Sequence, residues 1–117
     1  MKIRRDPLDI LAAKYIKLRD KWCQRCGGTG GLQTAHFHSR RLHATRYDPD
    51  NLCLLCFGCH QYIDSHASEK IEFFKSRLSE ERFEELELRA KGRGKIDRAA
   101  WRLYLNQLLK VAEDYEE

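Results

Sequence analysis

The sequence contains no apolar run long enough to cross a membrane, and it has no pattern typical of a secretory signal. It also lacks internal repeats and long linkers. These absences lead us to expect a single domain over residues 1–117, located in the cytoplasm and without a membrane partner. The five cysteines point the same way, because a secreted disulfide framework uses an even number and cytoplasmic thiols stay reduced.

Acidic residues are scarce in the first part of the chain. Residues 1–46 carry 11 Lys or Arg against 3 Asp or Glu, a net charge of +8, whereas residues 47–117 carry 11 against 15, a net charge of −4. The positive part would attract a phosphate-rich partner. For Lys14, Lys17 and Arg19 the alternative is that they only solvate one face of a helix.

Helix-capping residues recur along the chain. Asp6 followed by Pro7 is typical of a helix start, and the apolar spacing after it predicts an amphipathic helix over residues 7–20. Three later residues are candidate N-caps: Ser68, Ser79 and Asp97. The helices they predict cover residues 69–78, residues 80–90 and a stretch after residue 97, which together make residues 67–117 a helical C-terminal extension.

Between these helices the pattern favours short strands and turns. Residues 32–37 predict a strand, and residues 42–47 predict either a second strand or an irregular return. Residues 48–51, Asp-Pro-Asp-Asn, are a turn signal. A helix is expected to begin within residues 56–59, Cys-Phe-Gly-Cys, and to continue to about residue 65. The fold class is therefore α+β, with its core over about residues 20–66.

Two Cys-x2-Cys pairs are the most informative feature of the sequence: Cys23 with Cys26, and Cys56 with Cys59. Four thiolates in two such pairs suit one closed tetrahedral Zn²⁺ site, which stabilises a fold without taking part in chemistry. The fifth cysteine, Cys53, lies in an apolar run. It is expected to be a buried small hydrophobe and not a further ligand.

A histidine, an asparagine and a second histidine lie between and beside the cysteine pairs: His36, Asn51 and His60. With the sequence Ala-His-Phe-His over residues 35–38, this order resembles the zinc-stabilised HNH endonucleases over about residues 10–66. Residues 15–20 and 44–48 are similar to the phage NinG recombination-protein group, so a phage-related protein is expected. The resemblance implies a ββα-metal fold, in which a hairpin and a helix surround one catalytic divalent ion. It also implies hydrolysis of DNA phosphodiester bonds.

The resemblance further implies a role for each of the three residues. His36 stands at the position of the general base, and a neutral imidazole can take a proton from an attacking water. Asn51 stands where the family has the asparagine that steadies the hairpin and orients the base. Outside the resemblance, Asn51 is an ordinary turn residue after Asp-Pro-Asp. His60 stands at the position of a ligand for the catalytic ion, which acts as a Lewis acid.

One position departs from the family pattern. Many members have Asp or His directly before the base as a second metal ligand, and here Ala35 cannot bind a metal. His38, two residues beyond His36, would lie on the same side of an extended strand. Asp64, four residues after His60, would lie on the same helix face. Both are candidate replacement ligands, and two imidazoles would favour Mn²⁺, Ni²⁺ or Zn²⁺ over Mg²⁺.

Three arginines near the expected site suit phosphate contacts: Arg40, Arg41 and Arg46. A solvated loop is the alternative for them. The expected partner is DNA, and the C-terminal helices are a candidate surface for a homodimer. The main alternative to a nuclease is a zinc-knuckle module that binds nucleic acid without cutting it, which Ala35 favours. A purely structural interaction protein is another, whereas a zinc deaminase is set aside because no His-x-Glu motif precedes the second cysteine pair.

Overall fold

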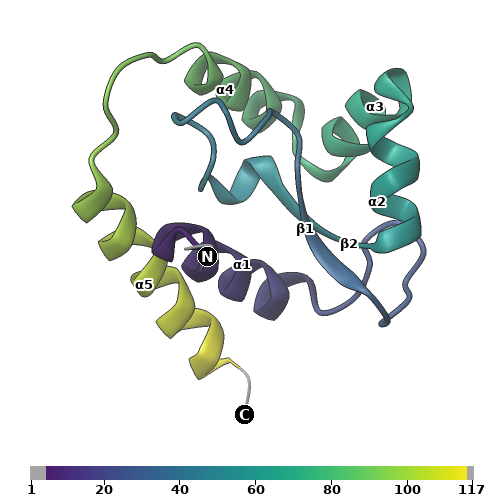
Figure 1. Cartoon of the computed structure of the whole chain (residues 1–117), viewed down its shortest axis with the longest axis horizontal. Helices are drawn as coiled ribbons and strands as arrows, with labels where there is room; N and C mark the ends of the chain where they lie inside the picture. The colour runs from purple at the N-terminus through teal and green to yellow at the C-terminus, as the bar shows by residue number, and fades with distance from the viewer. Residues whose placement is uncertain (1–4, 116–117) are drawn as a thin grey trace, which may run out of the picture.

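A two-stranded antiparallel hairpin lies at the centre of the structure, a computed structural model that describes residues 5–115 (Figure 1). Strand β1 (Leu32–His36) pairs with β2 (Leu52–Cys56), with Leu32 opposite Cys56 and His36 opposite Leu52. Helix α2 (Phe57–Asp64) follows β2 directly. Within residues 5–115 this hairpin is accompanied by five α-helices, and the expected α+β class is confirmed.

Four further helices surround the hairpin: α1 (Pro7–Asp20), α3 (Ala67–Arg77), α4 (Glu80–Ala90) and α5 (Arg98–Asp114). Helix α1 packs against α5 and both strands, whereas α2 packs on the hairpin and on α3 (Figure 1). Helix α4 packs against α3 and against the 3-10 turn Pro49–Asn51, which precedes β2. In the part of the chain that the structure describes, no helix has both the length and the apolar composition that a membrane span requires.

Strand β2 is buried on both faces, which accounts for its continuous apolar sequence. Because side chains alternate along a strand, Leu52 and Leu54 pack in a cluster with α1 and α5. Cys53 and Leu55 pack in a second cluster, with α2, α3 and α4. The hairpin therefore separates two small cores and presents one face to α1.

The second strand does not lie at residues 42–47. It lies at Leu52–Cys56. Residues 37–48 form an irregular return, so the second of the two alternatives predicted for residues 42–47, an irregular return, is confirmed. Within this return Thr45 N–H donates to the Leu42 carbonyl (3.2 Å), and Arg46 N–H donates to the His43 carbonyl (3.4 Å). These backbone groups are used in tight turns and are not free to pair with β1. The more apolar run after the turn takes the place of the expected strand.

Of the four expected N-cap residues, three are confirmed and one is wrong. The side chains of Asp6, Ser79 and Asp97 each accept a backbone hydrogen bond at the start of a helix. Ser68 does not cap a helix, because α3 begins one residue before it and has His66 at the N-cap position, without a side-chain bond. The His66 ring instead stacks on Tyr62, with ring centroids 4.0 Å apart, across the short link between α2 and α3.

Candidate functional site

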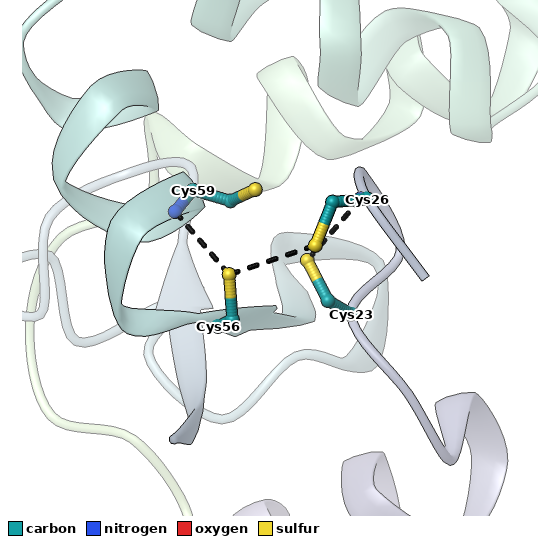
Figure 2. A group of neighbouring side chains, drawn as sticks. All are labelled: Cys23, Cys26, Cys56 and Cys59. Carbon is teal, nitrogen blue, oxygen red and sulfur yellow. Dashed lines mark hydrogen bonds between the residues drawn. The ribbon is translucent and has the colours of Figure 1, made fainter. Parts of the chain in front are cut away.

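The four cysteines of the Cys-x2-Cys pairs lie together, one pair after α1 and the other where β2 joins α2 (Figure 2). Their sulfur atoms all lie within 4.8 Å of one another, and Cys26 Sγ and Cys56 Sγ are 3.7 Å apart. Sulfurs around one zinc ion with Zn–S bonds of about 2.3 Å are about 3.8 Å apart. The four cysteines are thus positioned to bind a metal, and their donor set fits a structural Zn²⁺.

Each cysteine pair folds as a tight turn whose backbone N–H groups point at sulfur. Cys26 N–H donates to Cys23 Sγ, and Cys59 N–H donates to Cys56 Sγ, both at 3.4 Å. Burial raises the pKa of Cys23, but the backbone donors around it outweigh burial and lower this pKa to about 6. Gly27 after the first pair has φ of 78°, which glycine adopts without strain. At Cys23 the backbone therefore favours the thiolate, the form that binds metals, whereas burial is the first cause that raises the pKa of Cys59 to about 12.

Cys53 takes no part in this cluster. It is a fully buried residue of β2, and burial raises its pKa to about 12. The expectation that Cys53 is a small buried hydrophobe is confirmed.

A pocket of about 830 Å³ lies between α1 and the hairpin, with α2 and the start of α3 closing one side. Five of the residues predicted to form the site line it: His36, Arg40, Arg46, His60 and Asp64. They come from β1, the irregular return and α2. The fold therefore gathers histidines, a carboxylate and arginines that are up to 28 residues apart in the sequence.

His36 is the last residue of β1 and lines the pocket. Its Nε2 lies 3.2 Å from the carbonyl oxygen of Arg46. Because a carbonyl only accepts hydrogen bonds, Nε2 carries the proton, and Nδ1 is left as the proton acceptor. Burial, followed by the positive charge of Arg40, lowers the pKa of His36 to about 4. The imidazole is therefore neutral at pH 7.

Asn51 is fully buried and ends the 3-10 turn before β2. Its Oδ1 accepts from His38 N–H at 2.7 Å, and its Nδ2 donates to the carbonyl oxygens of His38 and Thr45, both at 3.1 Å. One side chain thus joins the two ends of the irregular return. The next residue after Thr45 is Arg46, whose carbonyl holds His36. Asn51 does not line the pocket and would act by positioning His36.

Replacing Asn51 by alanine should lower the free energy of unfolding by about 2–4 kcal/mol, because three buried or partly buried backbone groups lose their hydrogen-bond partner. Urea unfolding followed by circular dichroism measures this change. Asn106→Ala is the matched control, since Asn106 is exposed on α5. A loss no larger than that of the control would show that the return holds its shape without Asn51.

His60 forms a pair with Asp64 at the pocket wall. Its Nε2 lies 3.3 Å from Asp64 Oδ2, and its Nδ1 lies 2.7 Å from Gln33 Oε1. Because an amide oxygen accepts, Nδ1 donates to Gln33, and Nε2 is turned towards Asp64 Oδ2. Two ligands of one ion, each bound at about 2.1 Å, lie about 3 Å apart in an octahedral site. The spacing of the pair therefore suits one divalent ion.

The structure does not bring His38 to this pair. Strand β1 ends at His36, so the alternation expected to place both histidines on one side stops before His38. The His38 ring binds α4 instead, with Nε2 2.6 Å from Glu87 Oε1. Ala35 is fully buried in the cluster beneath the hairpin. A side chain at position 35 points into this core and away from the pocket.

The four cysteines are also the only complete ligand set found among residues 5–115. No other group of three or more His, Cys, Asp or Glu side chains in this range lies close enough to share an ion. An ion on His60 and Asp64 would take its remaining ligands from water or from a bound phosphate, as Mg²⁺ does in many phosphate-processing sites.

Two of the three predicted phosphate-binding arginines line the pocket, and both bind Asp9 of α1. Arg40 Nη2 lies 2.7 Å from Asp9 Oδ2, and Arg46 contacts Oδ2 and Oδ1 at 2.5 and 3.0 Å. Arg41 is exposed and lies outside the pocket lining. Two of these neighbouring arginines are therefore paired in the pocket, and the third is exposed outside it.

Sequence reasoning did not place four charged residues of the pocket lining in the site: Arg5, Asp6, Asp9 and Lys70. Lys70 belongs to α3, and its Nζ lies 2.9 Å from Asp64 Oδ1. In the sequence, Asp9 has the character of an ordinary acidic residue in the first turn of a helix, and Lys70 that of a solvated helix charge. No spacing links either to the HNH residues, and only the packing of α1 and α3 places them here.

Comparison with known proteins identifies one family. The model of the HNH endonuclease family matches residues 23–65, which include both cysteine pairs, His36, Asn51 and His60. The search of curated proteins and the search of solved structures gave no match. The finer likeness to the phage NinG group stays a prediction. An HNH domain indicates a nuclease or a nucleic-acid-binding function. Residues 23–65 of this chain are therefore an HNH endonuclease domain with four cysteines positioned to bind a metal.

Proposed function

We propose that this protein is a metal-dependent endonuclease that hydrolyses DNA phosphodiester bonds in the pocket between α1 and the hairpin. The observation that carries the proposal is that one pocket collects His36 and His60 of the HNH pattern together with Arg40 and Arg46. Nucleic-acid hydrolysis needs a proton acceptor, a cation at the phosphate and groups that hold the backbone. The pocket offers a candidate for each.

His36 is the proposed general base. Its neutral ring presents Nδ1 as the acceptor for a proton from the attacking water, because Nε2 is held by the Arg46 carbonyl. A base with a pKa of about 4 is weak, since efficient general bases have a pKa near the working pH. A bound phosphate beside the ring would raise the pKa of His36, because a nearby negative charge favours the imidazolium. Substrate binding would therefore make His36 a stronger base in the complex with DNA.

His60 and Asp64 are the proposed holders of the catalytic ion, which supplies Lewis-acid stabilisation of the reacting phosphate when bound. Gln33 fixes the ring of His60 with Nε2 turned towards Asp64. His38, held by Glu87, would contribute only after a change in the path of residues 37 and 38. One imidazole and one carboxylate are compatible with Mg²⁺, Mn²⁺, Ni²⁺ or Zn²⁺.

Arg40 and Arg46 are the proposed phosphate contacts inside the pocket, and the exposed Arg41 would reach the backbone outside it. Among residues 5–115 nothing supports the homodimer expected for the C-terminal helices, so the proposal is made for the single chain.

The proposal predicts nicking of supercoiled plasmid that requires an added divalent ion. Protein with zinc retained at the four cysteines would be freed of weakly bound ions and then given Mg²⁺, Mn²⁺, Ni²⁺ or Zn²⁺. Cleavage should appear on addition and should be lost in the double variant His60→Ala, Asp64→Asn, because this pair supplies the protein ligands. Gel electrophoresis measures the fraction of supercoiled plasmid that has been nicked. Cleavage that is unaffected by the double variant would contradict the assignment of the ion to His60 and Asp64.

A second candidate function is a binding module that holds nucleic acid without cutting it. It is favoured by the burial of Ala35 and by the incomplete ligand set at His60 and Asp64. In this case the protein would bind DNA in a salt-sensitive way, and no added metal would produce nicks.

A further inference from the structure

Asp9 of helix α1 lies between two arginines of the pocket. Its carboxylate accepts one hydrogen bond from Arg40 and two from Arg46, and only 20 % of its side chain is exposed. A carboxylate and a phosphodiester group each present two oxygens that arginine forks bind in a bidentate manner. The Asp9 carboxylate therefore occupies the kind of position that a backbone phosphate would take.

A third cation of the pocket, Lys70, is also paired with a carboxylate. Lys70 is held by Asp64 at 2.9 Å, as Arg40 and Arg46 are held by Asp9. A phosphate that binds Arg40, Arg46 or Lys70 must compete with a carboxylate, because each of these three cations is already paired. Such an exchange gains less free energy than binding to unpaired cations, since an existing ion pair is broken.

Asp9 also has a simpler explanation as an acidic residue in the first turn of α1, where it is favourable to the helix dipole. That role does not require arginines that are 31 and 37 positions further along the chain. Moreover, α1 ends before the matched HNH residues 23–65 begin. The wall that carries Asp9 lies outside the matched HNH residues, and it lines the same pocket as His36.

We propose that Asp9 is a specificity-determining residue that holds the phosphate position between Arg40 and Arg46, so that a DNA phosphodiester must displace it. This inference rests on the proposed nucleic-acid function of the pocket. When a single phosphate group binds, no other contact offsets the free energy lost on breaking the Asp9–arginine ion pairs, so binding is weak. A polynucleotide makes additional backbone contacts outside the pocket, and these offset the displacement. Asp9 thus selects extended nucleic acid over mononucleotides and inorganic phosphate.

The test is the affinity of the full chain for a short fluorescein-labelled DNA duplex, measured by anisotropy with zinc retained and no other divalent ion added. The variant D9N keeps the shape of the side chain and removes its charge. It should bind the duplex about three- to tenfold more tightly than the unchanged protein. The plot of log K against log salt should steepen by about one unit, because about one more phosphate is neutralised. Inorganic phosphate should compete with the duplex more effectively in the variant.

The matched control is E113Q, which makes the same charge change on α5. Glu113 pairs with Lys14 at 3.9 Å, both side chains are more than half exposed, and neither lines the pocket. A gain in D9N no larger than that in E113Q would overturn the inference, because it would then reflect net charge alone. Weaker binding by D9N would also overturn it, since Asp9 would then be a support for the arginines.

A double-mutant cycle between Asp9 and Arg40 provides a second readout of DNA affinity. If circular dichroism shows that D9N is poorly folded, the variant D9A takes its place in this cycle. R40A should cost little affinity in the unchanged protein, where Asp9 offsets the charge of Arg40, and severalfold more once Asp9 is replaced. Equal costs in the two backgrounds would contradict the inference. Both measurements use binding alone, so a chain that fails to nick plasmid with any metal would refute the proposed nuclease and leave this test intact.

Discussion

Plasmid cleavage should fall by about 10²- to 10⁴-fold when His36 is replaced by alanine, the usual range for the loss of a general base. His36 is the neutral histidine at the end of β1, with Nδ1 unprotonated and the residue in the pocket lining. The zinc content and the far-UV circular dichroism spectrum should not change, because the four cysteines make no contact with its ring. Rates of plasmid nicking under the best metal measure the effect.

His43→Ala is the matched control for this variant. His43 lies in the same irregular return, but it is exposed and outside the pocket lining. Its replacement should leave the rate within about twofold of the unchanged protein, within the range expected of a surface substitution. Full activity in the His36 variant would remove the proposed mechanism, although the pocket could still bind nucleic acid.

The dependence on pH offers an independent check on His36. Its pKa is about 4 in the folded protein and 6.5 in its ordinary state, so the unfolded chain takes up the proton first. The stability contributed by neutral His36 is therefore fully present above about pH 6.5 and is lost as the pH falls towards 4. Unfolding free energies measured across this window should fall less steeply in the alanine variant. For the same reason, kcat/KM should keep its value down to about pH 5, where an ordinary histidine would already be protonated.

Replacing Cys56 by serine should abolish binding of the structural zinc and unfold the core around the hairpin. Binding of Zn²⁺ to such sites is worth about 10–16 kcal/mol, which matches or exceeds the whole stability of a small domain. The Cys56 thiol lies 3.7 Å from Cys26 Sγ, and the residue joins β2 to α2. Zinc content by atomic emission and thermal unfolding by circular dichroism measure the two effects.

Cys53→Ala is the control, because Cys53 lies in the same strand and is buried without being part of the sulfur cluster. This variant should keep one zinc per chain and lose only about 1–2 kcal/mol of stability, as expected for a small cavity. If the Cys56 variant retained its zinc and melted together with this control, the four cysteines would not form the metal centre that their geometry indicates.

The sequence by itself was sufficient for the features that depend on local spacing. Two Cys-x2-Cys pairs specify a four-thiolate site wherever the chain lets the two turns meet, and the structure places all four sulfurs together. Asp6, Ser79 and Asp97 determine helix starts through bonds to their own neighbours. The order of His36, Asn51 and His60 between the pairs carried the family assignment for residues 23–65.

Tertiary structure decided the features that depend on which elements meet. The second strand lies at Leu52–Cys56 because that run is buried on both faces, which no pattern within residues 42–47 could reveal. The end of β1 at His36 turned His38 towards Glu87, away from the ligand position expected for it. The packing of α1 against the hairpin placed Asp9 beside Arg40 and Arg46. Contacts between residues 30 or more positions apart form only when separate helices, strands and loops pack together. Burial and charge pairing between these elements decide such contacts, and the local order of residues does not reveal them.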